Sequence, residues 1–510
     1  MKRLFACLLT LSMISAARAD VTLPVIIDNK MVLQRETQAP IWGWADAGEE
    51  VTVTFAGQTK KAMPGTKGLW MVKLDPMQAC AKSAVMTIKG KNTITLTDVL
   101  VGEVWLASGQ SNMEFSIGAV PDGEKEVIYA QKNNPLLRMF CVTGHFTASV
   151  ELDDTVGSWT TAPEFSAMLK SGKISGFSSH SAVGCFFGLK LQQELGVPVA
   201  IIDSTWGGRR IEQFISDAGF DAFKLNSKRT PKDQYPQILE KYKKAVGDMQ
   251  KAQKAAEQGR MNAISLGNIF GRVDNGIYNA MIAPLAPFAI KGAIWYQGES
   301  NRGAKDYFVK LQALSASWSK AFNVKDIPFY QVQIAPFDYS RGKDNANTTL
   351  CDSIWTAQYK SAAEIKGMGV VSIHDVNIPI KNIHPPCKQL VGDRLAAQAL
   401  KNQYGKNVTA TGPSFDAARL SGTKVMVSFK DVDQGLSTTD GKDPIWFELS
   451  SDGKTFVKAN AVIKGDKVAV SAAEVKDPKF VRMGWADIAI PTLKDKNGWP
   501  VFAFGTQPVK

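Results

Sequence analysis

The sequence lacks the patterns that mark several protein classes. Its 510 residues contain six cysteines and four histidines, and none of their spacings matches a zinc site. No GxSxG motif occurs, which argues against an α/β-hydrolase. Beyond the first residues no apolar run is long enough to cross a membrane, and there is no internal repeat. We therefore expect no metal site and a globular chain, as 45% hydrophobic and 21% charged residues indicate.

The first nineteen residues are typical of an export signal. Lys2 and Arg3 precede a short apolar stretch, and Ala17-Arg18-Ala19 forms a small-x-small cleavage site. We expect cleavage after Ala19 and a mature protein in the periplasm or outside the cell. An oxidising compartment would permit one or two disulfides among the remaining cysteines.

Positive charges outnumber negative charges in the chain as a whole. The net charge is +12, and it falls to +9 when residues 1–19 are removed with their three basic side chains. The lysines are scattered, and the densest stretch, residues 239–260, is typical of a solvated helix face. We therefore expect no nucleic-acid partner, although a basic surface also suits an acidic sugar.

The hydrophobic pattern predicts three regions after the signal. Residues 20–100 and 406–510 alternate apolar and polar residues between turns, which favours a β-sandwich and a second β-rich domain. Residues 101–405 alternate helices with strands that are apolar on both faces, as in an open parallel sheet covered by helices. The expected strands are 103–108, 197–206, 290–297, 327–335 and 368–375, with a helical insertion at about 212–262.

The stretch WLASGQSNMEF, residues 105–115, ends a predicted strand in a small turn that carries Ser111. Ligands of open α/β sheets bind at the carboxyl ends of the strands, and a nucleophilic serine needs an adjacent base. His384 is the candidate base, because it lies in a proline-containing loop after the fifth strand and before a helix. We read His180 and His374 as structural and find no signal near His145. The alternative for His384 is a residue that only caps a helix.

Two more loops are expected at the same sheet edge. Gly207 and Gly208 follow the second strand and can expose backbone N–H groups. Gln297 and Glu299 follow the third strand. Backbone donors and a side-chain amide that converge on one point would form an oxyanion hole. The alternatives are a plain turn for the glycines and, for Glu299, a role in orienting neighbouring loops, which we prefer to direct catalysis.

At these residues the chain resembles a known family. GQSNMEF, STWGG, AIWYQGESN and IHPPCKQLVGDRLA occur in the order and spacing of the sialate O-acetylesterases of the SGNH-hydrolase superfamily. The resemblance covers nearly all of the mature chain. It implies a flavodoxin-like three-layer α/β/α domain, serine-dependent removal of O-acetyl groups from sugars, and no cofactor. It puts the nucleophile on Ser111, the base on His384, and the oxyanion site on Gly208 and the Gln297–Glu299 turn.

The sequence departs from the family pattern at two places. Lys381 stands where related esterases often carry an Asp three residues before the histidine. Asp375 is then the candidate acid partner, and a backbone carbonyl that leaves a Ser–His dyad is the alternative. Arg209 and Arg210 stand where smaller residues are usual. They can pair with the carboxylate of a sialic acid or form an exposed loop pair.

These residues favour an esterase acting on O-acetylated sialic acid. Acetylated xylan or xyloglucan would use the same catalytic residues in a different cleft. A non-catalytic carbohydrate-binding protein would have no use for Ser111 paired with His384. A glycosidase is disfavoured, because no convincing second acid accompanies Glu299.

Overall fold

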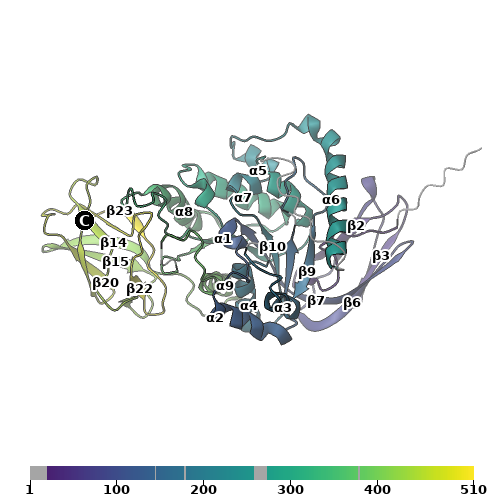
Figure 1. Ribbon diagram of the computed structural model, residues 1–510, viewed down its shortest axis with the longest axis horizontal. Helices are drawn as coiled ribbons and strands as arrows, with labels where there is room; N and C mark the ends of the chain where they lie inside the picture. Colours follow the sequence, from purple (N-terminus) through teal and green to yellow (C-terminus); the bar gives the residue numbers. More distant parts are fainter. Residues whose placement is uncertain (1–19, 144, 177–179, 258–272, 377–379) are drawn as a thin grey trace, which may run out of the picture.

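The computed structural model describes residues 20–143, 145–176, 180–257, 273–376 and 380–510. A β-rich N-terminal part, a central part of strands and helices and a β-rich C-terminal part follow one another along the molecule (Figure 1). The predicted export signal, residues 1–19, lies outside the described residues. Within them, no helix has the length and apolar character needed to span a bilayer.

The N-terminal part is built from short strands and one long strand that leaves it, and all its pairs are antiparallel except that of the first short strand with the long one. The short strands are β1 (Val32–Gln34), β2 (Ala39–Trp44), β3 (Val51–Phe55), β4 (Gln58–Ala62), β5 (Leu69–Leu74) and β6 (Cys80–Lys89). The long strand, β7 (Thr93–Gly109), pairs with β6 through its first half and with central strands through its second half. The boundary predicted at residue 100 therefore falls inside one continuous strand.

The central sheet has the strand order β13-β12-β11-β7-β10-β8-β9. Its further strands are β8 (Leu137–Val142), β9 (Gly157–Thr161), β10 (Val199–Thr205), β11 (Gly292–Tyr296), β12 (Phe329–Val332) and β13 (Met368–Val371). All pairs are parallel except β8 with β9. Each of the five predicted strands is found here. The fifth is shorter than predicted, so His374 lies in the turn after β13 and not inside the strand.

Helices cover both faces of this sheet. On one face, Trp105 of β7 packs edge-on against Phe187 of α4 (Ala182–Leu195), with ring centroids 5.1 Å apart. Next to α4 lies α9 (Gln389–Tyr404). On the other face, Trp295 of β11 packs against Trp318 of α7 (Tyr307–Ala321) at 5.8 Å, and α8 (Thr356–Glu364) packs beside α7. The remaining helices are α1 (Ser111–Glu114), α2 (Asp122–Tyr129), α3 (Ala162–Lys170), α5 (Asp217–Ala222) and α6 (Tyr235–Glu257).

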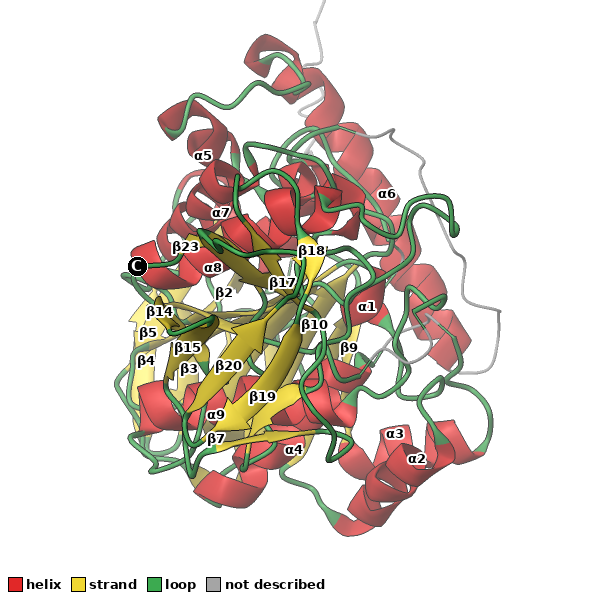
Figure 2. Cartoon of the chain, turned by 90° about the vertical axis from the view of Figure 1, so that its left-hand side faces the viewer, coloured by secondary structure: helices red, strands yellow, loops and turns green. Residues whose placement is uncertain are grey.

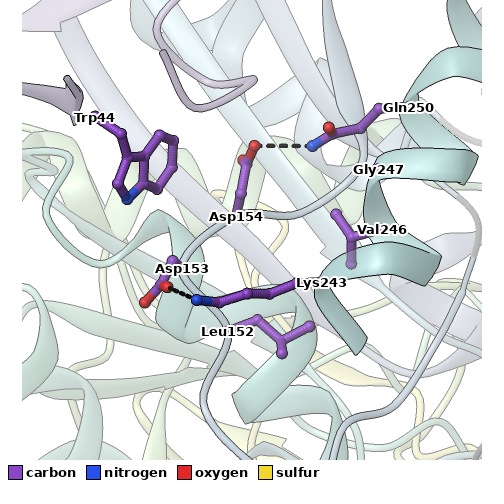
Figure 3. A pocket seen from close by; sticks show the side chains of 8 residues that line it. All are labelled: Trp44, Leu152, Asp153, Asp154, Lys243, Val246, Gly247 and Gln250. Carbon is purple, nitrogen blue, oxygen red and sulfur yellow. Dashed lines mark hydrogen bonds and ion pairs between the residues drawn. The ribbon is translucent and has the colours of Figure 1, made fainter. Parts of the chain in front are cut away.

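The predicted helical insertion contains α5 and α6, and α6 meets the N-terminal part at a hollow of about 250 Å³ (Figure 3). Asp154 joins the parts there. Its carboxylate accepts the backbone N–H of Val25 at 3.1 Å, that of Thr155 at 2.8 Å and the amide of Gln250 on α6 at 2.8 Å. Burial raises the pKa of Asp154 to about 6. Because Asp154 bonds both to Val25 and to Gln250, the hollow lies where the N-terminal part, the loop of Asp154 and α6 are held together.

The C-terminal part has a hydrophobic core of its own, and its strands face the viewer in Figure 2. Its antiparallel sheets have the orders β14-β15-β20-β19 and β18-β17-β21-β23, with β16 pairing β22. The strands are β14 (Ser414–Ser421), β15 (Lys424–Lys430), β16 (Leu436–Thr438), β17 (Phe447–Ser450), β18 (Val457–Lys458), β19 (Asn460–Lys464), β20 (Lys467–Ser471), β21 (Phe480–Met483), β22 (Leu493–Asp495) and β23 (Phe504–Pro508).

The cysteines among the described residues are all free thiols, so none of the disulfides that the sequence permits is formed between them. Cys141, Cys185 and Cys351 are buried. Burial raises the pKa of Cys185 to about 12, so it packs as a small apolar residue.

Candidate active site

Ser111 stands at the carboxyl edge of the central sheet. Strand β7 ends at Gly109, and Ser111 is the first residue of α1. Gly109 has a φ of +141°, and a Cβ there would lie 2.3 Å from the carbonyl oxygen of Tyr296 in β11. Only glycine permits this close approach, which brings the serine turn against the end of the neighbouring strand.

His384 meets Ser111 although 273 residues separate them in the chain. The ring Nε2 lies 2.8 Å from the hydroxyl Oγ, and both side chains are half-buried. The loop is braced by the backbone N–H of His384, which donates to Oδ1 of Asn382 at 3.0 Å. Burial and then the charge of Lys388 lower the pKa of His384, while Glu114 raises it. An imidazole that is neutral near pH 7 can accept a proton from a serine.

Asp375 has a different partner from the predicted one. The guanidinium of Arg394 on α9 donates to both carboxylate oxygens, each at 2.7 Å. This bidentate pair is a strong geometry for an arginine and a carboxylate. The prediction that Asp375 orients the imidazole of His384 is therefore corrected: Asp375 ties the end of β13 to α9.

The glycine pair after β10 lies directly against Ser111. A Cβ on Gly207 would lie 3.3 Å from the Ser111 Cβ and 2.7 Å from Glu114 Oε2. The N–H of Gly207 already donates to Glu114 at 2.6 Å. Gly208 is exposed and has a φ of +68°. Among the described residues, no acceptor is found for the backbone N–H groups of Ser111 and Gly208, so both can bind an oxyanion.

Gln297 is buried, and its side-chain amide forms hydrogen bonds to neighbouring loops. Its Nε2 lies 3.0 Å from Gln110 Oε1, 3.1 Å from the carbonyl oxygen of Arg209 and 2.8 Å from Asn301 Oδ1. Tyr307 donates to its Oε1 at 2.7 Å. An amide has only two hydrogens to donate, so none is left for an oxyanion. The prediction for Gln297 is therefore corrected from an oxyanion donor to a clamp between the loops that follow β7, β10 and β11.

Glu299 and Asn112 form a second contact between loops. Asn112 Nδ2 donates to Glu299 Oε1 at 2.6 Å and to the carbonyl oxygen of Ile383 at 3.0 Å. Its Oδ1 accepts from Lys388 Nζ at 2.7 Å. This geometry gives Glu299 the orienting contact that we preferred for it. Burial raises the pKa of Glu299.

Glu114, in the helix that Ser111 begins, contacts His145, which stacks on Trp206, and the sequence did not assign these residues to the site. Glu114 pairs with His145 Nε2 at 3.0 Å. The His145 ring stacks on Trp206 with centroids 5.3 Å apart and an interplanar angle of 11°. The Arg209 guanidinium covers the same indole at 3.7 Å. Glu114 lies inside the serine motif and was available to sequence reasoning, whereas His145 comes from a loop with no local signal.

The two arginines of this loop differ in exposure. Arg209 is only 6% exposed, because it stacks on Trp206. Arg210 is exposed and pairs with Glu212 at 2.9 Å. Of the two, Arg210 is the more accessible to a solute, and Arg209 supports the wall of the site.

The chain is similar to several known carbohydrate esterases. A family model described as "Carbohydrate esterase, sialic acid-specific acetylesterase" matches residues 270–401. The chain is 32% identical to a sialate O-acetylesterase from Rattus norvegicus over 419 residues, covering 76% of this chain and 74% of the relative. It is 30% identical to the Homo sapiens sialate O-acetylesterase over 454 residues, covering 83% and 79%.

A solved structure is similar over almost the whole chain. It is a carbohydrate acetylesterase from Xanthomonas citri, with a TM-score of 0.78 and 29% sequence identity, and the match covers 96% of this chain and 100% of that one. Together with the relatives above, this match extends beyond the motifs to the central sheet and the flanking β-rich parts. The chain therefore belongs to the sialate O-acetylesterase family and is a carboxylic ester hydrolase.

Proposed function

We propose that the protein removes O-acetyl groups from sugars by acyl transfer to Ser111, with His384 as the base. His384 takes the hydroxyl proton as Oγ attacks the acetyl carbonyl, and the protonated imidazole then gives this proton to the departing sugar oxygen. Water, activated by the same imidazole, hydrolyses the acetyl-enzyme. The single observation that supports this most directly is the 2.8 Å contact between His384 Nε2 and Ser111 Oγ.

The tetrahedral intermediate carries a negative oxygen that needs donors. We assign this role to the backbone N–H groups of Ser111 and Gly208, for which no acceptor is found among the described residues. The N–H of Gly207 donates to Glu114 at 2.6 Å, so this third N–H group cannot donate to the oxyanion.

The charge that develops on His384 during the reaction also needs compensation. Asp375 does not supply it, because Arg394 holds both of its oxygens. Glu114 raises the pKa of His384 and Lys388 lowers it. In this proposal Glu114 stabilises the imidazolium that forms after proton transfer, and Lys388 keeps the resting imidazole neutral.

The fold we propose for the catalytic part, residues 101–405, is the three-layer α/β/α arrangement of SGNH hydrolases. The five predicted strands, taken in chain order, lie side by side in the order second, first, third, fourth, fifth. This is the order of flavodoxin-like sheets. Residues 20–100 and 406–510 flank it as β-rich domains, and we propose that residues 1–19 direct export.

O-acetylated sialic acid is the substrate we propose. The matched family model and the rat and human relatives carry this specificity in their names, and Arg210 offers a positive charge at the loop that follows Gly208. Acetate release from O-acetylated sialic acid and from acetylated xylan, measured side by side, tests the assignment. Faster release from xylan would favour a neutral plant polysaccharide instead.

Replacing the nucleophile tests the mechanism itself. Ser111→Ala should lower kcat on 4-nitrophenyl acetate by about 10⁴-fold or more, because the hydroxyl that accepts the acetyl group in the proposed mechanism is removed. Ser108→Ala is the matched control: it lies three residues earlier, and its hydroxyl donates to the carbonyl oxygen of Ser204 at 2.6 Å. It should keep kcat within about threefold while losing one buried hydrogen bond. Activity near wild type in Ser111→Ala would overturn the proposal.

A further inference from the structure

Lys388 is a buried cation close to the serine turn. Its side chain is fully buried, and Nζ donates to Oδ1 of Asn112 at 2.7 Å. Nζ also lies 4.8 Å from the ring centre of Phe115 and 5.3 Å from that of Tyr296. Lysine is almost never fully buried without a partner. Here the acceptor is the neutral amide of Asn112. The bond therefore gives the ammonium an acceptor and also fixes the orientation of the amide.

Asn112 connects the chain neighbours of both reacting residues. It follows Ser111 directly, and its Nδ2 donates to the carbonyl oxygen of Ile383, the residue before His384. The other donor contact of Nδ2 is Glu299 Oε1. With Lys388 on Oδ1, both hydrogens and the oxygen of the amide are used. The opposite orientation of the amide would set its NH₂ group against the ammonium, so the lysine fixes which way Asn112 points.

The backbone of Lys388 is anchored independently. Glu124 Oε2 on α2 accepts the N–H of Lys388 at 3.1 Å and that of Gln389 at 3.2 Å. N–H groups at a helix start have no acceptor within the helix, and Glu124 supplies one to α9. Lys388 is thus fixed to α2 by its main chain and to α1 by its side chain, and His384 lies four residues before it.

We propose that Lys388 is a positioning residue for ester hydrolysis, an inference that rests on the Ser111–His384 mechanism proposed above. Its side chain holds Asn112 in the orientation that ties the loop of His384 to the turn of Ser111. Nε2 is thereby kept within hydrogen-bond reach of Oγ. A displacement of about 1 Å at such a contact costs on the order of 100-fold in rate.

The charge of Lys388 has a second effect on the base. Burial lowers the pKa of Lys388 to about 7, while Glu299 from the turn after β11, Glu124 from α2 and the neighbouring Cys387 raise it. His384 faces Lys388 and Glu114, and its pKa is lowered from 6.5. Over the range in which His384 titrates, Lys388 is therefore protonated and disfavours the imidazolium.

Lys388→Met tests both effects, because methionine has a similar length but no charge and no donor. On 4-nitrophenyl acetate, kcat should fall by about 10- to 100-fold while KM stays within about threefold, since the alignment of the base is lost and not the binding of the ester. The acidic limb of kcat/KM should move to higher pH, because the like charge that lowers the pKa of His384 is gone.

Arg138→Met is the matched control for removing a buried cation. Arg138 is 1% exposed and donates to the carbonyl oxygen of Lys30 at 2.7 Å. It lies near the amino end of β8, whereas Ser111 lies past the carboxyl end of β7. This variant should lower Tm and leave kcat and the acidic limb unchanged. If Lys388→Met behaves like Arg138→Met, the lysine only stabilises the fold and the inference is wrong.

Asn112→Ala separates the two effects and decides the matter if Lys388→Met does not fold. It removes the tie between the two loops but keeps Lys388 itself, whose protonated form Glu299 and Glu124 still favour. We expect the fall in kcat without the shift of the acidic limb, and a wild-type kcat would overturn the positioning role. Failure of the mechanism itself is distinguished by Ser111→Ala, whose activity does not depend on either result.

Discussion

Three charged residues around the base differ in what neutralises them. Asp375 is held by the two parallel bonds of Arg394. Glu114 divides its oxygens between His145 and the N–H of Gly207. Lys388 rests on a neutral amide. A charge that is fully paired contributes little to the field at its neighbours. Burial lowers the pKa of His384 most, and Lys388 and Glu114 are the charges that act on it in addition.

Replacement of Asp375 by asparagine distinguishes a structural acid from a catalytic one. Asp375→Asn keeps one acceptor for Arg394 but leaves a buried guanidinium without its counter-charge. The free energy of unfolding, measured in urea, should fall by about 1–3 kcal/mol, while kcat changes by less than about threefold. The opposite result, unchanged stability with a loss of about 10⁴-fold in kcat, would restore Asp375 as the partner of the imidazole.

Some residues of the site could be predicted from the sequence and others could not. Ser111 and His384 could be predicted, because a serine after a buried strand and a histidine in a loop at the same sheet edge are compatible in chemistry. Lys388 could not, because a lysine at the start of a helix is normally exposed. Only the packing of α1, α2 and β11 around it makes this lysine a buried group.

At the scale of elements, one amide holds the loops of three strands together. Gln297 follows β11, and it reaches Gln110 after β7 and the carbonyl oxygen of Arg209 after β10. These loops carry Ser111 and Gly208. In the proposed mechanism, the distance between Ser111 and Gly208 is therefore set by a residue that contacts neither the acetyl group nor His384.

The clamp is tested by Gln297→Leu, which has a similar shape and no polar atoms. The carbonyl oxygen of Arg209 would lose the amide donor, whereas Gln110 and Asn301 would keep the backbone N–H groups of Ser300 and Ile211. The free energy of unfolding should fall by about 1–3 kcal/mol. The value of kcat/KM should fall by about 100-fold, because Gly208 is no longer held against Ser111. Gln297→Glu, which keeps the acceptor for Tyr307 and loses the donors, should lose as much activity. If both variants keep wild-type kcat/KM, the clamp does not matter for the reaction.

The strands of the central sheet differ in whether their local sequence pattern predicts them. Strands β7, β10, β11, β12 and β13 are continuous apolar runs between turns, and they were predicted from that pattern. Strand β8 (LRMFCV) and its antiparallel partner β9 were not predicted, because a short apolar run does not distinguish a buried strand from a buried helix. The pairing of β8 with β10 is a long-range contact that no local pattern encodes.

At the scale of the whole molecule, Asp487 joins the C-terminal part to the catalytic part. It is 2% exposed, and its Oδ2 accepts from Arg302 at 2.8 Å, while its Oδ1 accepts the N–H of Leu350 at 2.8 Å. Arg302 follows the turn of Glu299. Asp487 of the C-terminal part therefore bonds to Arg302, which directly follows the turn that contains Glu299, and Glu299 accepts from Asn112.

Removing this joint should separate the two parts thermally. Asp487→Ala leaves the N–H of Leu350 without its acceptor and removes one of the two side-chain acceptors of Arg302, which keeps Asn347. Because the C-terminal part has a core of its own, we expect it to unfold separately in this variant. Calorimetry should show one transition in the wild type and two in the variant. Asp452→Ala is the control, because Asp452 bonds only within its own turn, to Ser450, Lys454 and Thr455. It should lower Tm without dividing the transition, and an undivided transition in Asp487→Ala would count against the joint.

The sequence by itself determined the mixed α/β class, five strands of the central sheet and the candidate roles of Ser111 and His384, because periodicity and the chemistry of strand ends are local properties. The tertiary structure decided the partner of Asp375, the commitment of Gln297 and the burial of Lys388. These depend on which loops meet at the carboxyl edge of the sheet and on how much water is excluded there. Hydrogen-bond partners and local dielectric are properties of that packing, and residues hundreds of positions apart create them together.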